Sequence, residues 1–347
     1  MRPLPKIILA AAAFAAICSP AFAAKGAKPL FAADSVISLT LSGPLGSLSR
    51  KPDAKPVPGT LKVEGAAPET LPVQLVTRGV TRRTKEVCSF PPLRVEFAQK
   101  PADGSLFKGQ KSLKLVTHCQ DGDRYQQQLL LEYAAYRLYS ALTPESFEVR
   151  LAKINYLGDS GRPIATRLGF FIEDVDDMAA RNGQTRLKGV ARINAAQIDP
   201  QAAARFAVFQ YMISNLDWAM TLASPGDPDC CHNSRLLSAK AGGSLITVPY
   251  DFDYSGLVDA PYAVPPENSG LRNVRTRRYR GFCRYNDEAK AFAAALVPRR
   301  AALMAIIDQT PELSDRYRGR ADDYLGEFFD EIANPANMDK VLSSCLR

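Results

Sequence analysis

The chain has 347 residues and a formal net charge of +8, from 44 Lys and Arg against 36 Asp and Glu. Hydrophobic residues make up 46% of it and charged residues 23%. These values are typical of a globular protein and exclude a chain that is mainly disordered, collagen-like or coiled coil. The positive charge is too modest to make nucleic acid the leading partner.

The first 23 residues are typical of a cleaved secretory signal peptide rather than a membrane anchor. Arg2 and Lys6 precede an apolar run at 7–17, and Ala21-Phe22-Ala23 forms a small-x-small cleavage site. The apolar run is shorter than the roughly 20 residues of a membrane span. We therefore expect cleavage after Ala23, a periplasmic or secreted protein, and a mature chain without a transmembrane span.

The cysteines agree with export. An even number remains after the signal peptide, which predicts disulfide bonds in an exported chain. Their pairing is not determined by the sequence, although Cys88 and Cys119 flank strand-like segments and are the expected pair. A zinc site is not favoured, because Cys230, Cys231 and His232 are adjacent rather than spaced as metal ligands.

The elements expected in the first half are mostly strands. Residues 24–70 form a lead-in rich in Pro, Gly and Ala, with one possible strand at 36–41. Alternating apolar residues then predict an antiparallel sheet, and a helix with apolar spacings of three and four follows it. The expected strands are 73–76, 93–97, 113–116, 149–156 and 167–171, and the expected helix is 125–142.

The second half is expected to be mostly helical. Its predicted helices are 175–181, 202–216, 287–308 and 314–332, with a short hairpin at 234–237 and 245–248. We therefore divide the chain into a β-rich lobe with one long helix, 71–173, and a mostly helical lobe, 174–347. The expected fold class is α+β with two lobes and a ligand in the cleft between them.

Acidic and amide side chains cluster around the predicted hairpin. Asp217 ends a helix, Asn233 precedes the hairpin, and Asp251 and Asp253 follow it. Phosphoryl transfer needs a carboxylate that receives the acceptor's proton, which is the role expected of Asp217, and oxygen ligands for Mg²⁺ or Mn²⁺. The expected metal ligands are Asn233, Asp251 and Asp253. Each residue also has a structural interpretation, as a helix end or a solvated turn.

The first half offers a possible phosphate-binding pair. Lys114 lies on a predicted strand and Glu132 on the following helix. A strand lysine held by a helix glutamate and directed at nucleotide phosphates is used for phosphoryl transfer. A purely structural salt bridge would satisfy Glu132 equally well, and Lys108 or Lys111 stays open as the lysine that reaches the phosphates.

The order of these residues resembles the spore coat protein H (CotH) kinase family, an atypical branch of the protein-kinase-like fold. The resemblance covers roughly residues 75–255. Its points are Arg78-Gly79, the helix at 130–139, the segment 169–176, Asp217, Asn233, and Asp251 with Asp253. The chain departs from the family in an insertion at 219–231, in Tyr250 where the family has Trp, and in lacking a Gly-rich loop. The resemblance implies a two-lobed kinase-like fold, ATP with Mg²⁺ or Mn²⁺, and phosphoryl transfer to an acceptor hydroxyl.

An arginine-rich segment follows at 272–284, and its candidate anion-binding residues are Arg275, Arg277, Arg278 and Arg280. Arginine forks suit an acidic or phosphorylated substrate, and the interleaved tyrosines suit a polyanionic polymer. A solvated basic face paired with the acidic helices that follow is equally compatible with the pattern.

Two functions compete at this point. The first is an exported kinase-like transferase that passes a phosphoryl group from ATP to a hydroxyl of an unknown acceptor, a protein or an envelope component, with nucleotidyl transfer left open. The alternative is a catalytically inactive kinase-fold envelope protein that binds an anionic ligand or partner through its arginine-rich segment.

Overall fold

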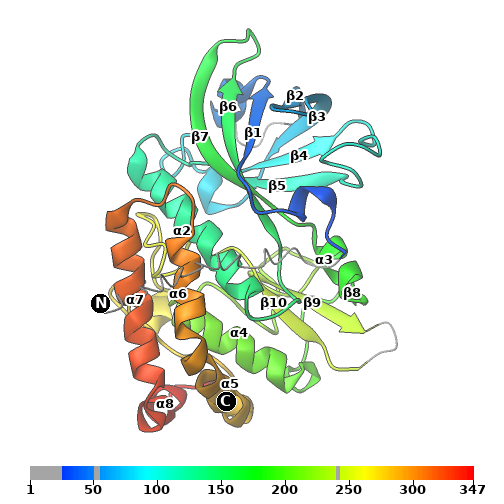
Figure 1. Ribbon diagram of the computed structural model, residues 1–347. Coiled ribbons are helices and arrows are strands. Elements are labelled where there is room, and N and C mark those ends of the chain that lie inside the picture. The colour runs from blue at the N-terminus through cyan, green and yellow to red at the C-terminus, as the bar shows by residue number, and fades with distance from the viewer. Residues whose placement is uncertain (1–25, 51–54, 240–242) are drawn as a thin grey trace, which may run out of the picture.

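The structure is a computed structural model that describes residues 26–50, 55–239 and 243–347. The expected signal peptide lies outside these residues. In space, a β-barrel forms one end of the described part of the molecule, and most of the helices form the other end together with a small sheet (Figure 1).

Seven strands of the described chain close into a barrel in the order β1-β2-β3-β4-β5-β7-β6. Neighbours along this order are antiparallel, and the barrel closes through a parallel pair, β1 with β6, in which Leu39 lies opposite Ile154. Alternate side chains point inward and fill the interior with apolar atoms. The strands are β1 (Ile37–Ser42), β2 (Val57–Val63), β3 (Glu69–Thr77), β4 (Leu93–Phe97), β5 (Ser112–Val116), β6 (Val149–Leu157) and β7 (Pro163–Ile172).

The lead-in contributes more strand than its composition predicts. Residues 24–70 contain β1, β2 and the start of β3, where the sequence predicted one strand. Pro58 and Gly59 lie inside β2 and disfavour a strand in sequence-based reasoning. At Gly59, however, a Cβ atom would lie 2.7 Å from the carbonyl oxygen of Ser42. Glycine is therefore required there because the backbone at the end of β1 approaches closely.

Helices α2 to α8 pack below the barrel together with a three-stranded sheet, ordered β10-β9-β8, whereas α1 packs on the barrel itself (Figure 1). The strands of this sheet are β8 (Gln184–Arg186), β9 (Ser234–Ala239) and β10 (Ile246–Pro249). The long helix α2 is buried on most of its surface, because it packs against β6 and β7 and also against α6. The helices are α1 (Leu45–Arg50), α2 (Asp123–Ser140), α3 (Val175–Arg181), α4 (Pro200–Met212), α5 (Asn286–Leu296), α6 (Arg300–Asp308), α7 (Asp315–Ile332) and α8 (Pro335–Leu342).

The prediction of a two-lobed protein-kinase-like fold is wrong. A closed seven-stranded mixed barrel, with a separate small sheet and helices, takes the place of the expected β-rich lobe and helical lobe. The barrel closes because β1, from the lead-in, pairs with β6 more than a hundred residues later. Local periodicity carries no information about a pairing so distant in the chain.

Disulfide bonds join all the cysteines of the described chain. The expected pair, Cys88 with Cys119, is present, and the other bonds are Cys230–Cys231 and Cys283–Cys345. None of the described helices has both the length and the apolar composition needed to cross a membrane.

Candidate functional site

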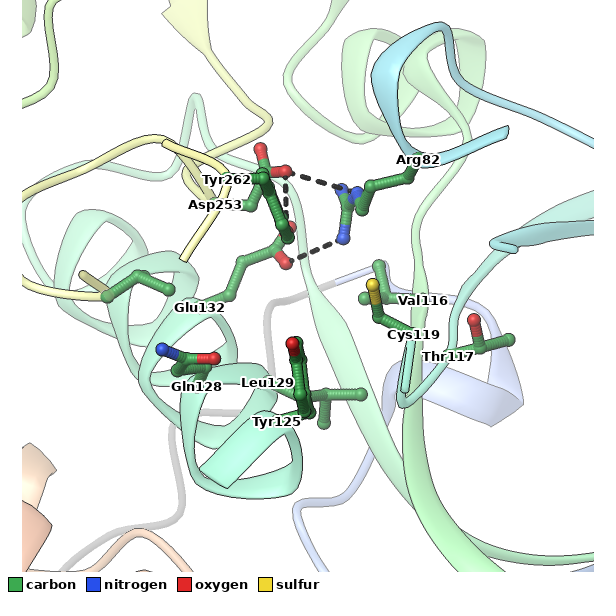
Figure 2. Close-up of a pocket in the computed structure, with 11 residues that line it drawn as sticks. Arg82, Val116, Thr117, Cys119, Tyr125, Gln128, Leu129, Glu132, Asp253 and Tyr262 are labelled. Atoms are coloured by element: carbon green, nitrogen blue, oxygen red, sulfur yellow. Dashed lines mark hydrogen bonds and ion pairs between the residues drawn. The ribbon is translucent and has the colours of Figure 1, made fainter. Parts of the chain in front are cut away.

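A buried arginine is surrounded by three carboxylates. Arg82, in the short 3-10 turn Thr81–Arg83, contacts Glu132 Oε2 at 3.1 Å, Asp251 Oδ1 at 3.0 Å and Asp253 Oδ2 at 3.1 Å. The side chains of Arg82, Glu132 and Asp253 are only 8%, 2% and 7% exposed, whereas that of Asp251 is 27% exposed. We call Glu132, Asp251 and Asp253 the carboxylate triad. Figure 2 shows Arg82 directed at Glu132 and Asp253.

Two distant parts of the chain bring the triad together. Glu132 lies in the middle of α2, and both aspartates follow the end of β10. Tyr136, one turn beyond Glu132, accepts a hydrogen bond from the backbone N–H of Asp251 at 2.8 Å, and Tyr262 donates one to Asp253 at 3.0 Å. Asp251 has a φ of 64°, which is uncommon for a residue other than glycine. The hydrogen bond to Tyr136 of α2 therefore helps to hold the backbone of Asp251 in this left-handed conformation.

One guanidinium cannot neutralise three carboxylates, and the pKa values reflect this. Burial raises the pKa of Glu132 to about 8 and that of Asp253 to about 6, in both cases against the attraction of Arg82. Burial also acts to raise the pKa of Asp251, but Arg82, Arg78 and Lys114 outweigh it and lower that pKa. Asp251 is therefore the carboxylate of the triad that stays charged.

The triad has the donor set of a metal site. Its carboxylate oxygens lie within 4.8 Å of one another, and Glu132 Oε1 is buried with no hydrogen-bond partner among the described residues. Oxygen ligands suit Mg²⁺ and Mn²⁺. Arg82 nevertheless already bonds one oxygen of each carboxylate. A divalent cation would fit the triad only if Arg82 gave up some of these contacts.

A second cluster holds Asp217. His232 Nε2 lies 2.6 Å from Asp217 Oδ1, and Asn233 Nδ2 donates to Asp217 Oδ2 at 2.9 Å. The other ring nitrogen of His232 lies 2.6 Å from the hydroxyl of Ser224. The hydrogen bond with Asp217 raises the pKa of His232. Asp217 keeps 36% of its side chain exposed, so its carboxylate is both fixed in orientation and accessible.

Lys114 does not pair with Glu132. It lies on β5 with its Nζ 4.6 Å from the ring centre of Tyr250, and the guanidinium of Arg235 lies at the same distance from that ring. Burial and the nearby cations Arg78 and Arg235 lower the pKa of Lys114 to about 7. Arg78, Lys114 and Arg235 therefore form a cationic rim beside Asp251.

Arg82, rather than the expected Lys114, is the partner of Glu132, and sequence reasoning missed it. It lies in a polar stretch, 81–86, where no periodicity marks a buried residue. The only available signal was that Glu132, within an apolar helix, requires a cation. Of the predicted metal ligands, Asp251 and Asp253 come together, whereas Asn233 bonds through its amide nitrogen to Asp217.

The candidate anion-binding arginines mostly contact the chain itself. Arg277 donates to the backbone carbonyl of Met212, the last residue of α4, and Arg280 to that of Leu216 just after the helix, whereas Arg278 donates to the carbonyl of Ser269. Arg275 packs on the ring of Tyr324 in α7 at 4.4 Å from the ring centre. These contacts anchor residues 275–280, which form neither helix nor strand. Anion binding by Arg277, Arg278 and Arg280 stays a prediction.

In comparison with known families and curated proteins, the chain matches no family model and no curated protein. The resemblance to the CotH family therefore stays a prediction from the sequence.

Proposed function

We propose that this protein is a metal-dependent phosphotransferase that uses ATP and acts on a hydroxyl acceptor. The observation that carries the proposal is the fixed carboxylate of Asp217, held by His232 and Asn233 and still accessible. A carboxylate in this state suits the capture of a proton from an attacking hydroxyl. The proposal concerns the site and does not depend on a kinase fold.

The residues support a consistent transfer step. The acceptor oxygen bonds to the γ-phosphorus, its proton passes to Asp217, and the bond from phosphorus to the β–γ bridging oxygen breaks, so that ADP leaves. Lys114, Arg78 and Arg235 offer positive charge to the leaving phosphates. A bound Mg²⁺ or Mn²⁺ would add charge neutralisation. Asp251 and Asp253 would hold that ion, and Arg82 would then keep fewer of its contacts with the triad.

Export supports an acceptor outside the cytoplasm. The disulfide bonds of the described chain are typical of oxidising compartments. With the sequence features of the first 23 residues, they favour a periplasmic or secreted protein and an acceptor that is a protein or envelope component.

The test is ATP hydrolysis with water as the acceptor, measured with Mg²⁺ and with Mn²⁺. Loss of a positioned base typically costs about 10²- to 10⁴-fold in rate. Asp217→Asn should lose at least 10²-fold in kcat by that measure while still binding ATP. The control is Asp103→Asn, which removes a carboxylate that is 91% exposed on the surface. An Asp217→Asn protein with unchanged turnover would contradict the proposal.

The Ser224–His232–Asp217 chain favours a second candidate function, covalent hydrolysis. Its two hydrogen bonds, both 2.6 Å, place a serine, a histidine and an aspartate in the order of a nucleophile, its base and the group that orients the base. A fluorophosphonate probe separates the two functions, since only the hydrolase would be labelled at Ser224 and lose that label in Ser224→Ala. Absence of labelling would exclude the hydrolase.

A further inference from the structure

A basic pocket of about 390 Å³ lies between α2, α7 and the loop at 257–259, and Asp217 is not among the residues that line it. This volume falls in the range of small-molecule sites, roughly 300–1,000 Å³. We call it the arginine pocket. Its polar lining includes Arg124, Gln128, Asp259, Arg275, Arg316 and Arg320.

The pocket has a strong excess of positive charge. Four arginines line it, against a single carboxylate, Asp259. The carboxylate of Asp259 already forms an ion pair with Arg320, whose Nη2 lies 3.0 Å from Asp259 Oδ2. Within the described part of the chain, Arg124 and Arg316 are exposed and make no hydrogen bond or ion pair. Two guanidinium groups are therefore free to bind an anion.

Two helix N-termini meet beside the pocket. Gln127 of α2 donates to the carbonyl of Glu312 at 3.2 Å and accepts from the N–H of Ser314 at 2.9 Å, so that α2 and α7 begin side by side. Both helices have 18 residues, and the positive ends of their dipoles favour an anion here. The first residues of the helices, Asp123 and Asp315, do not line the pocket.

A buried polar atom also points to a ligand. Gln128 is only 6% exposed and lies on α2 between two pockets, lining both the arginine pocket and the pocket beside Arg82 and Glu132. Its Nε2 donates to the carbonyl of Asp259 at 2.7 Å, but its Oε1 has no partner within the described residues. An unpaired buried acceptor is costly unless a ligand supplies a hydrogen-bond donor. The anion expected here therefore carries a hydroxyl group as well as negative charge.

We propose that the arginine pocket binds a small molecule with two or more phosphate groups on a hydroxylated, sugar-like frame. Arg124 and Arg316 bind the phosphates as charged forks, and Arg275 and Arg320 add positive charge at the wall. The Gln128 Oε1 atom accepts from a hydroxyl of the frame. This site is additional to the phosphotransferase site and does not require it to be active.

The test is titration calorimetry of the oxidised protein at fixed ionic strength. The probes are fructose 1,6-bisphosphate, which has both features, and inorganic phosphate, which lacks the frame. Arg124→Ala and Arg316→Ala should each weaken binding of the bisphosphate about tenfold, since a charged hydrogen bond is lost. The control, Arg162→Ala, removes an exposed arginine from the turn between β6 and β7 and should leave the affinity unchanged. Asp217→Asn should also leave it unchanged.

Specific outcomes overturn the proposal. Absence of bisphosphate binding to the unmodified protein does so directly. An equal loss of affinity in Arg162→Ala would show attraction to overall charge rather than to the pocket. Binding of inorganic phosphate as tight as that of the bisphosphate would refute the hydroxylated frame. A dye-based melting curve for each variant separates lost binding from lost folding.

Discussion

Removal of Arg82 should destabilise the protein strongly. Arg82→Met removes both the cation and the hydrogen-bond donor of Glu132 and Asp253, which are 2% and 7% exposed and must then be protonated to stay buried, whereas Asp251 at 27% can regain contact with water. Loss of one partner of a buried ion pair typically costs about 3–5 kcal/mol. We expect a loss of that size in the free energy of unfolding near neutral pH. The measurement is urea denaturation followed by circular dichroism.

The matched control is Arg94→Met. Arg94 pairs with Glu96 at 3.5 Å, but their side chains are 49% and 36% exposed. An exposed pair of this kind contributes at most about 1 kcal/mol. A loss in Arg82→Met as small as that of the control would refute the argument. Adding Glu132→Gln and Asp253→Asn to Arg82→Met should restore stability, because a neutral amide needs neither the cation nor a bound proton in order to stay buried.

The same variant tests the triad as a set of metal ligands. With Arg82 gone, three carboxylates within 4.8 Å are free for a cation. Mn²⁺ or Mg²⁺ should then raise the unfolding midpoint of Arg82→Met more than that of the unmodified protein, because binding to the folded state adds to its stability. Equal shifts in both proteins would contradict the assignment of these ligands.

Three further predictions concern protonation and cross-linking. Lys114 should react with an amine-acylating reagent with a pH midpoint of about 7, as followed by mass spectrometry, and a midpoint near its ordinary value of 10.5 would contradict its burial. Because Glu132 holds its proton to a higher pH in the folded than in the unfolded chain, with pKa values of about 8 and 4.5, its contribution to stability falls as pH rises between them. When the pH is raised from about 5 to about 8, the free energy of unfolding should therefore fall less in Glu132→Gln than in the unmodified protein. An equal fall in both proteins would exclude a raised pKa for Glu132. Replacing Cys283 and Cys345 by serine should lower the free energy of unfolding by about 2–4 kcal/mol in urea denaturation, since their bond closes a long loop; an unchanged value would refute this.

The sequence predicted individual elements well where they have strong periodicity. The helix expected at 125–142 is α2, Asp123–Ser140, and the strand expected at 93–97 is β4. The hairpin that carries Asn233 and Asp251 on its flanks was also expected, and it places these residues near each other. Patterns of period two and 3.6 are local, so they survive in a single sequence.

The assembly of these elements was not predictable in the same way. The parallel pair of β1 and β6 closes the barrel, and nothing in either strand specifies a partner so far along the chain. The pairing of Glu132 with Arg82 joins residues 50 apart through a turn without a pattern. The order of motifs along the chain was therefore compatible with an incorrect fold.

The most direct test of the central claim, a phosphotransferase site, is calorimetry of the oxidised protein with ATP in the presence and absence of Mg²⁺ or Mn²⁺. We expect binding that requires the metal, is lost in Asp251→Ala, and persists in Arg316→Ala, which alters only the arginine pocket. Absence of binding with either metal, or binding that survives Asp251→Ala and disappears in Arg316→Ala, would contradict a nucleotide site at the triad.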